Sequence, residues 1–189
     1  MRKLLAALVL GSLPFLHGCF PLVLGGAAAT SGYLVGEDRR PTQTMAQDER
    51  IELRITDLMH QKHGEAHINA TSYNRMVLLT GEAPSEQVKA NIEATARSVP
   101  DVRGIVNEIQ VSGNSGMPAR ANDTYVTSKV KARFLDARKF NPVHVKVITE
   151  GGTVYLMGLV KRQEADAATE IARTTSGVKR VVRVFEYQD

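Results

Sequence analysis

The sequence of 189 residues contains no Trp, five Tyr, five Phe and a single Cys. One Cys cannot close an intrachain disulfide, and it is too few for a zinc or iron–sulfur site built from cysteines. The apolar run at residues 4–16 is too short to cross a bilayer as a helix. With 43% hydrophobic and 23% charged residues, the composition is that of a soluble globular protein and argues against a fully disordered chain or a polytopic membrane protein.

Two basic residues precede the apolar run, so residues 1–18 are predicted to be a secretory signal peptide. The Leu-His-Gly-Cys sequence ending at Cys19 resembles a bacterial lipobox, whose cysteine is lipidated, by palmitate among others, and becomes the first mature residue. Phe20 follows the cysteine, at the position where lipoproteins retained in the inner membrane usually have Asp. The resemblance implies a lipid anchor in the outer membrane, facing the periplasm. The alternative is an ordinary signal peptide that leaves a free thiol at Cys19.

The segment after the cysteine is rich in Gly, Ala and Thr and has little periodicity, so residues 19–47 are interpreted as a lipidated N-terminus with a flexible tether. The remainder consists of an internal repeat. His67-Ile68 matches His144-Val145, and residues 77–81 match residues 154–158, in each case 77 positions later. We therefore predict one domain at 48–112, a linker at 113–121 and a second domain at 122–189.

Each copy begins with apolar residues at three- and four-residue steps, which indicates an amphipathic helix. Two β-rich runs follow, at 68–72 and 77–81 in the first copy and at 143–149 and 154–160 in the second. A second helix and a last apolar strand complete each unit. This order predicts an α+β fold, αββαβ, with a three-stranded mixed sheet packed against two helices in each domain.

The order of elements resembles the BON domain, and the likeness is carried by residues 77–81, Gly158 and residues 177–181. Residues 122–127, 155–160 and 176–181 are further similar to dual-BON outer-membrane lipoproteins. This resemblance implies a role in outer-membrane integrity at the division site. It also implies a link to the β-barrel assembly machinery or to regulators of peptidoglycan amidases.

Residues that could support chemistry are few. His60, His63 and His67 have a spacing that could serve a metal, but Gly64 should end the helix between them and no carboxylate or Cys completes the set. The plainer interpretation is a solvated helix end. The sequence also contains no phosphate-binding Gly loop. We therefore predict no enzymatic activity, no cofactor and no metal.

Charge is unevenly distributed between the two copies. Residues 48–112 contain seven Lys or Arg and ten Asp or Glu, a net charge of −3, whereas residues 120–189 contain thirteen and eight, a net charge of +5. A basic domain could bind nucleic acid, but an exported lipoprotein does not meet nucleic acid in its compartment. Anionic phospholipid, such as phosphatidylglycerol, is the better partner.

At 100° per residue, the outer face of the second copy's opening helix carries a mixture of apolar and basic side chains, namely Tyr125, Lys129, Lys131, Leu135 and Lys139. The matching face of the first copy carries Glu49, Glu52 and Asp57 instead. An aromatic ring with a polar end beside lysines suits a membrane interface. The alternative is a solvated basic face with Tyr125 packed on the neighbouring repeat.

In dual-BON lipoproteins of this kind, the same helix binds anionic phospholipid. The resemblance adds residues to the predicted site, which is then made up of Tyr125, Val126, Lys129, Val130, Lys131, Arg133, Phe134, Leu135 and Lys139. Periodicity places Val130 and Phe134 on the inner face, where they would shape the helix. The rival hypothesis is a protein-interaction adaptor whose lipid contact is incidental.

Overall fold

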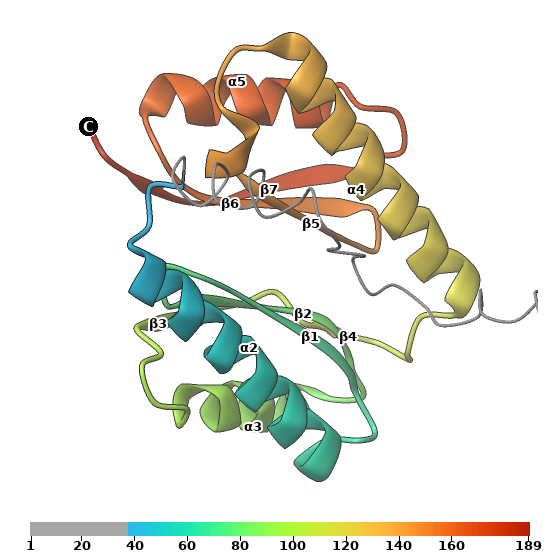
Figure 1. The fold of residues 1–189 in the computed structure, drawn as a ribbon. Coiled ribbons are helices and arrows are strands. Elements are labelled where there is room, and N and C mark those ends of the chain that lie inside the picture. Colours follow the sequence, from blue (N-terminus) through green and yellow to red (C-terminus); the bar gives the residue numbers. More distant parts are fainter. Residues whose placement is uncertain (1–37) are drawn as a thin grey trace, which may run out of the picture. The chain divides into compact units, whose positions relative to one another are not determined.

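The structure is a computed structural model that describes residues 38–189 (Figure 1). The predicted signal peptide, Cys19 and most of the tether lie outside the described residues. The first repeat comprises α2 (Thr42–Lys62), β1 (His67–Tyr73), β2 (Met76–Ala83), α3 (Glu86–Arg97), β3 (Gly104–Asn107) and β4 (Gln110–Val111). The second comprises α4 (Met117–Ala137), the 3₁₀ turn η1 (Pro142–His144), β5 (Lys146–Glu150), β6 (Thr153–Val160), α5 (Arg162–Arg173) and β7 (Arg180–Tyr187). The predicted αββαβ order is confirmed, except that two short strands, β3 and β4, take the place of the last strand in the first copy, whose sheet therefore has four strands.

Both sheets are mixed, as predicted. In the first, β1 pairs antiparallel with β2, and β3 and β4 pair parallel with β2. In the second, β5 pairs antiparallel with β6, and β7 pairs parallel with β6. The last strand of the first sheet is interrupted because the Asn107 side chain accepts a hydrogen bond from the Ile109 N–H at 3.2 Å, and the Ile109 side chain is fully buried.

Each sheet is covered on one face by the two helices of its own repeat (Figure 1). The core of the second repeat includes the inner face of α4, the inner face of α5 and alternate residues of β6. These residues are Val126, Val130, Phe134, Ala168, Ala172, Val154 and Leu156. The first repeat contains an equivalent core around Ile51, Ile55, Val77, Leu79 and Ile92. The three- and four-residue spacing in the sequence therefore marks the buried helix faces correctly.

A third apolar cluster joins the sheet faces that the helices leave open. Tyr73 and Leu78 of the first repeat pack with Tyr155 and Met157 of the second, and all four are at most 3% exposed. Strands β2 and β6 are thus buried on both faces, which explains why both read as nearly continuous apolar runs in the sequence.

Two glycines within the central strands permit a close approach of backbone. A Cβ atom at Gly81 would lie 1.9 Å from the carbonyl oxygen of His67, and one at Gly158 would lie 2.3 Å from that of His144. A side chain at either position would overlap the neighbouring backbone. This contact accounts for the glycine that closes the matching segments of the two copies.

Three segment boundaries differ from the prediction. Helix α4 begins at Met117, with Gly116 as N-cap and Pro118 in the first turn, so half of the expected linker is helical. Helix α2 begins at Thr42, inside the expected tether. Pro142 fixes a short 3₁₀ turn, and strand β5 consequently starts only at Lys146.

Candidate functional site

Helix α4 presents the predicted site on two distinct faces. Val126, Val130 and Phe134 are at most 1% exposed and pack in the core of their repeat, so these three cannot contact a ligand at the surface. Tyr125 and Leu135 lie on the outer face and are 63% and 64% exposed. Tyr125 is therefore not packed on the neighbouring repeat, and that part of the alternative is wrong.

Tyr125 lies beside a lysine that is itself held in place. The Lys129 Nζ atom is 5.2 Å from the centre of the Tyr125 ring and donates a hydrogen bond of 2.7 Å to the carbonyl oxygen of Ser176. The ammonium thus satisfies a carbonyl just beyond the end of α5 and at the same time sits over an aromatic face. Tyr125 and Lys129 thus place an aromatic ring and a positive charge side by side on the surface.

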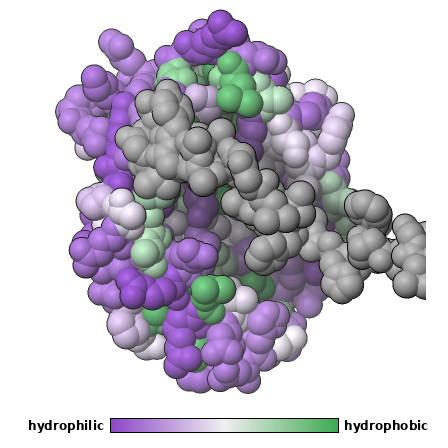
Figure 2. Space-filling model, viewed as in Figure 1, coloured by the Kyte–Doolittle hydropathy of each residue, from purple (hydrophilic) through white to green (hydrophobic). Residues whose placement is uncertain are grey.

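The remaining cations of the outer face reach solvent. Lys131 is exposed on α4, and Lys139 is exposed just after the helix ends at Ala137. Together with Tyr125 and Leu135 they form what we call the α4 outer face, defined as Tyr125, Lys129, Lys131, Leu135 and Lys139. In the view of Figure 2, hydrophobic side chains of the described residues form small separate patches on a mainly hydrophilic surface.

Arg133 is occupied by a neighbouring helix. Its guanidinium donates to the Ile171 carbonyl at 2.9 Å and to the Thr175 and Thr174 hydroxyls at 2.7 and 3.1 Å. These acceptors lie at the carboxyl end of α5, where carbonyl groups lack helical partners and a cation is favourable. Arg133 thus connects α4 to α5, although the family resemblance placed it in the predicted phospholipid-binding set.

A buried aspartate within α4, which the sequence pattern did not reveal, holds this helix against the hairpin turn of its repeat. Asp123 is 6% exposed and accepts hydrogen bonds of 2.8 Å from the N–H groups of Gly151 and Gly152, in the hairpin turn of its repeat. Both glycines have positive φ, as a tight hairpin turn requires. The carboxylate therefore ties the opening helix to the turn.

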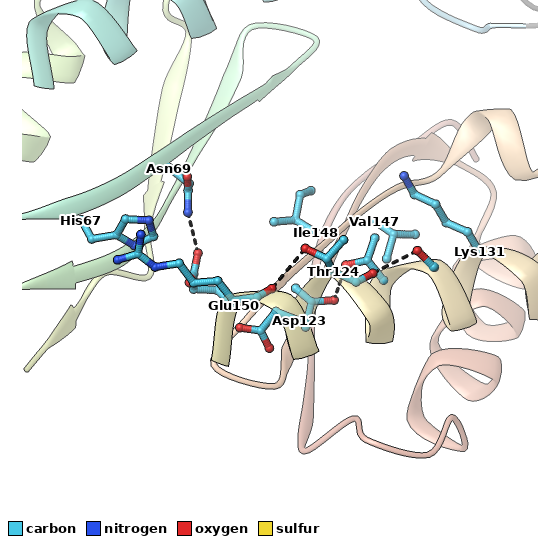
Figure 3. Close-up of a pocket in the computed structure, with 12 residues that line it drawn as sticks. His67, Asn69, Asp123, Thr124, Lys131, Val147, Ile148 and Glu150 are labelled. Atoms are coloured by element: carbon cyan, nitrogen blue, oxygen red, sulfur yellow. Dashed lines mark hydrogen bonds between the residues drawn. The ribbon is translucent and has the colours of Figure 1, made fainter. Parts of the chain in front are cut away.

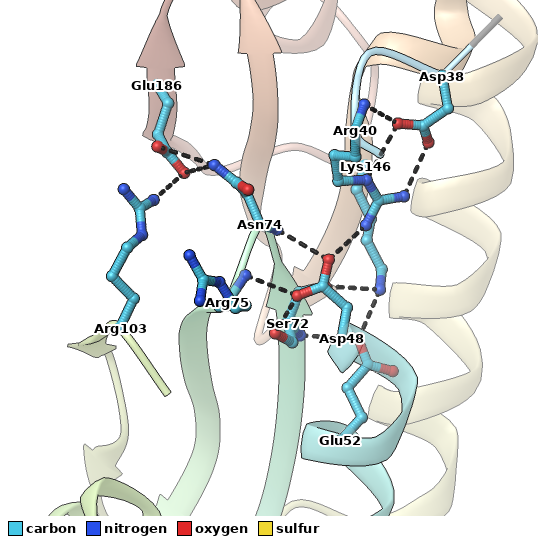
Figure 4. A network of polar contacts seen from close by, with 10 residues as sticks. All are labelled: Asp38, Arg40, Asp48, Glu52, Ser72, Asn74, Arg75, Arg103, Lys146 and Glu186. Carbon is cyan, nitrogen blue, oxygen red and sulfur yellow. Dashed lines mark hydrogen bonds and ion pairs between the residues drawn. The ribbon is translucent and has the colours of Figure 1, made fainter. Parts of the chain in front are cut away.

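The first repeat uses the same link. Asp48 accepts from the N–H groups of Asn74 and Arg75 at 2.8 and 2.7 Å (Figure 4). In both copies the aspartate lies three positions before the first buried apolar residue of the helix, Ile51 or Val126. This shared position is the signal that could have revealed the pair from the sequence.

Polar contacts also connect the two repeats. Lys146 donates to the Glu52 carboxylate at 2.6 Å, and Arg103 forms an ion pair with Glu186 (Figure 4). Arg180 reaches Glu108 at 3.2 Å. Two of these three contacts pair a cation of the basic second copy with a carboxylate of the acidic first copy.

The segment before α2 contacts both repeats. Arg39 donates to the Glu164 carboxylate at 2.6 and 2.9 Å and to the Leu159 carbonyl at 2.9 Å. Arg40 donates to Asp48 at 2.8 Å, and its guanidinium lies 3.9 Å from the centre of the Tyr73 ring. Residues 38–47 thus belong to the folded part of the chain, so the expected tether is shorter than predicted.

A cleft of about 490 Å³ lies along one side of α4 and is lined by residues of both repeats (Figure 3). His67 and Asn69 line it from the first repeat, and Lys131 and Glu150 line it from the second. His60, His63 and His67 line a second cleft together, where the His63 ring also lies 3.1 Å from the Thr95 hydroxyl. Among the described residues, however, these three histidines do not form a group whose donor atoms all lie within 4.8 Å of one another.

Within residues 38–189, none of the helices combines the length and the apolar character that a membrane crossing demands.

Comparison with known proteins identifies the repeats. Residues 47–113 and 122–189 each match the BON domain. The chain is 37% identical over 192 residues to the outer membrane lipoprotein DolP of Haemophilus influenzae, covering 100% of this chain and 97% of that protein. It is 35% identical over 153 residues to a 21 kDa hemolysin of Actinobacillus pleuropneumoniae, covering 79% of each. The homology with DolP supports an outer-membrane lipoprotein with two BON domains.

Proposed function

Since the chain belongs to the BON-domain family and is a dual-BON protein similar to DolP over its full length, we propose that it binds anionic phospholipid through the α4 outer face. The site is non-enzymatic in this proposal. Its ligand class is a lipid with a negatively charged headgroup, such as phosphatidylglycerol. The protein would thereby support the integrity of the outer membrane in which it is anchored.

The observation that carries the proposal is the exposure of Tyr125 and Leu135 on a helix whose Val126, Val130 and Phe134 are buried. Single large apolar side chains are common on protein surfaces. Tyr125 and Leu135, however, lie on the same helix, and lysines lie between them and after Leu135. An aromatic ring with a hydroxyl prefers the headgroup level of a bilayer, and a lysine can extend its ammonium to the phosphates. The α4 outer face offers both kinds of group.

Individual residues contribute in different ways. Tyr125, Lys131, Leu135 and Lys139 would contact lipid directly, while Lys129 is shared between lipid and the Ser176 carbonyl. Val126, Val130 and Phe134 hold the helix on its core, and Arg133 holds it against α5. Changes at these last four residues would therefore act through the position of the helix.

The contact between α4 and lipid would be much weaker than the acyl anchor, and this difference limits its role. Each lysine near an anionic surface contributes about 1 kcal/mol, whereas each buried methylene of an acyl chain contributes about 0.8 kcal/mol. Several acyl chains on Cys19 would hold the protein in the membrane far more firmly than the helix could. The helix contact would instead select the membrane region, because the tether already supplies a high local concentration of lipid.

If the helix contact selects the membrane region, the protein should be unevenly distributed over the cell. We propose that the protein concentrates where anionic phospholipid is enriched, which the family resemblance puts at the division site. The β-barrel assembly machinery and regulators of peptidoglycan amidases are the partners that the same resemblance suggests. A fluorescent fusion carrying Tyr125→Glu should then lose any concentration at mid-cell while it stays in the membrane.

Vesicle flotation tests the binding proposal without the acyl anchor. Residues 37–189 form one compact unit, and we expect this fragment to float with phosphatidylglycerol vesicles but not with phosphatidylcholine vesicles. Tyr125→Glu should abolish flotation. Leu53→Glu is the matched control, because Leu53 is 65% exposed on α2 of the other repeat. Equal flotation with both lipids, or loss with Leu53→Glu only, would support the adaptor hypothesis instead.

A further inference from the structure

Three side chains that can bind metal ions converge at the cleft between the repeats. His67 begins β1, Glu82 lies directly opposite it in the β1–β2 register, and Glu150 ends β5 of the second repeat. One donor atom from each lies within 4.8 Å of the other two. Figure 3 shows His67 and Glu150 together at this cleft.

The two carboxylates are poorly neutralised by the protein. Glu150 accepts hydrogen bonds from two neutral groups, the Asn69 amide at 2.8 Å and the Thr80 hydroxyl at 3.4 Å. The site would therefore gain from an additional positive charge.

Nearby basic side chains do not supply that charge. Arg120 also lines the cleft, but its Nε donates to the Ser115 hydroxyl at 3.3 Å. Within residues 38–189, neither Glu82 nor Glu150 has a Lys or Arg nitrogen within 4.0 Å. The His67 imidazole lies next to these carboxylates, with its Nδ1 atom 3.2 Å from Glu82. It carries a positive charge only when it is protonated.

We propose that His67, Glu82 and Glu150 bind one divalent ion of the zinc class, which links the two BON domains. Tetrahedral zinc takes nitrogen and oxygen ligands at about 2.0–2.1 Å, which puts neighbouring ligand atoms about 3.3 Å apart. The pair from His67 and Glu82 already has this spacing, at 3.2 Å. Glu150 needs only a small movement of its side chain to reach the same spacing. Water takes the fourth position in the coordination of the ion.

The donor set indicates the kind of ion. Calcium and magnesium prefer sites made entirely of oxygen atoms, whereas an imidazole with two carboxylates suits zinc and its transition-metal neighbours. The surrounding groups fit such a site, because Asn69 and Ser115 donate to Glu150 and Glu82, at 2.8 and 3.3 Å, and would orient both carboxylates. Since the ligands come from both repeats, the ion would strengthen the packing of one against the other.

Metal content provides the test, and it is independent of the phospholipid proposal. The full chain, purified in detergent and stripped with EDTA, is dialysed against micromolar ZnCl₂ and its zinc is measured by mass spectrometry. We expect one zinc per chain and a higher midpoint of thermal unfolding than in EDTA. Glu150→Gln and His67→Gln should each weaken binding about tenfold or more. His60→Gln, an exposed histidine outside the set, should leave it unchanged.

Circular dichroism in EDTA establishes that each variant is folded before its zinc is measured. Co²⁺ gives a second measurement, because a four-coordinate site has intense visible absorption, and this should appear in the native chain and disappear in Glu150→Gln. Absence of zinc after dialysis would overturn the proposal. Equal zinc in the native chain and in folded Glu150→Gln would overturn it as well, and so would a preference for Ca²⁺ over Zn²⁺.

Discussion

The Lys129 ammonium lies 5.2 Å from the centre of the Tyr125 ring, one helical turn away on the same exposed side of α4. The lysine also donates to the Ser176 carbonyl, so its position is fixed from two sides. A ring held beside a cation loses little further freedom when it meets a membrane surface. This relationship makes Tyr125 the centre of the proposed phospholipid contact.

Arg133 and Lys131 should separate stability from binding. Arg133→Ala removes the donors that reach Ile171, Thr174 and Thr175, so we expect the free energy of unfolding to fall by about 1–3 kcal/mol. Lys131→Ala should leave unfolding unchanged and weaken vesicle binding about fivefold, which corresponds to about 1 kcal/mol per lysine. Urea unfolding and vesicle titration measure the two effects. The reverse pattern would show that we have exchanged the roles of the two residues.

Asp123 should be important for the fold of the second domain. Asp123→Ala leaves the N–H groups of Gly151 and Gly152 without their acceptor in a buried turn, so we expect a loss of about 3 kcal/mol in the free energy of unfolding. Asp136→Ala, at an exposed position of the same helix, serves as the control and should change it little. Denaturant melts of both variants provide the measurement, and equal stability would disprove this role.

The glycines of the central strands should tolerate no side chain. We expect Gly158→Ala to destabilise the protein severely, because its Cβ would overlap the His144 carbonyl oxygen. Gly113→Ala is the control, since a Cβ there meets nothing within 4 Å. Thermal unfolding followed by circular dichroism distinguishes them. A Gly158→Ala protein that unfolds at the native temperature would mean that the strands can move apart at this point.

The contact between Arg39 and Glu164 should depend on pH. The hydrogen bond from Arg39 holds the pKa of Glu164 below its ordinary value of 4.5, because it favours the ionised carboxylate. The stabilisation is therefore fully present above about pH 4.5 and is lost as the pH falls through the lowered pKa. We expect Arg39→Ala to be less stable than the native chain at pH 7, and the difference to become smaller as the pH is lowered below 4.5. A constant difference in urea unfolding across this range would contradict the assignment.

Local patterns in the sequence were sufficient for much of the fold. The spacing of Val126, Val130 and Phe134 marks a buried helix face, and the duplicated glycine segments mark equivalent central strands. The outer face of α4 followed from the same periodicity, because residues opposite a buried stripe must face solvent.

Features that depend on tertiary contacts could not be obtained in this way. The hydrogen bonds from Arg133 depend on where α5 ends relative to α4. The proximity of His67 and Glu150 depends on how the two repeats pack. The early start of α4 at Met117 was hidden by a composition typical of a linker, which the Gly116 cap and Pro118 convert into a helix start.

The most direct test of the account is a map of the residues that respond to lipid. Backbone NMR shifts of residues 37–189 would be followed while phosphatidylglycerol or phosphatidylcholine micelles are added. We expect shifts centred on Tyr125, Lys131 and Leu135 with the anionic lipid alone, and their loss in Tyr125→Glu. Shifts confined to the first repeat, or the same shifts with phosphatidylcholine, would contradict the claim that α4 recognises anionic headgroups.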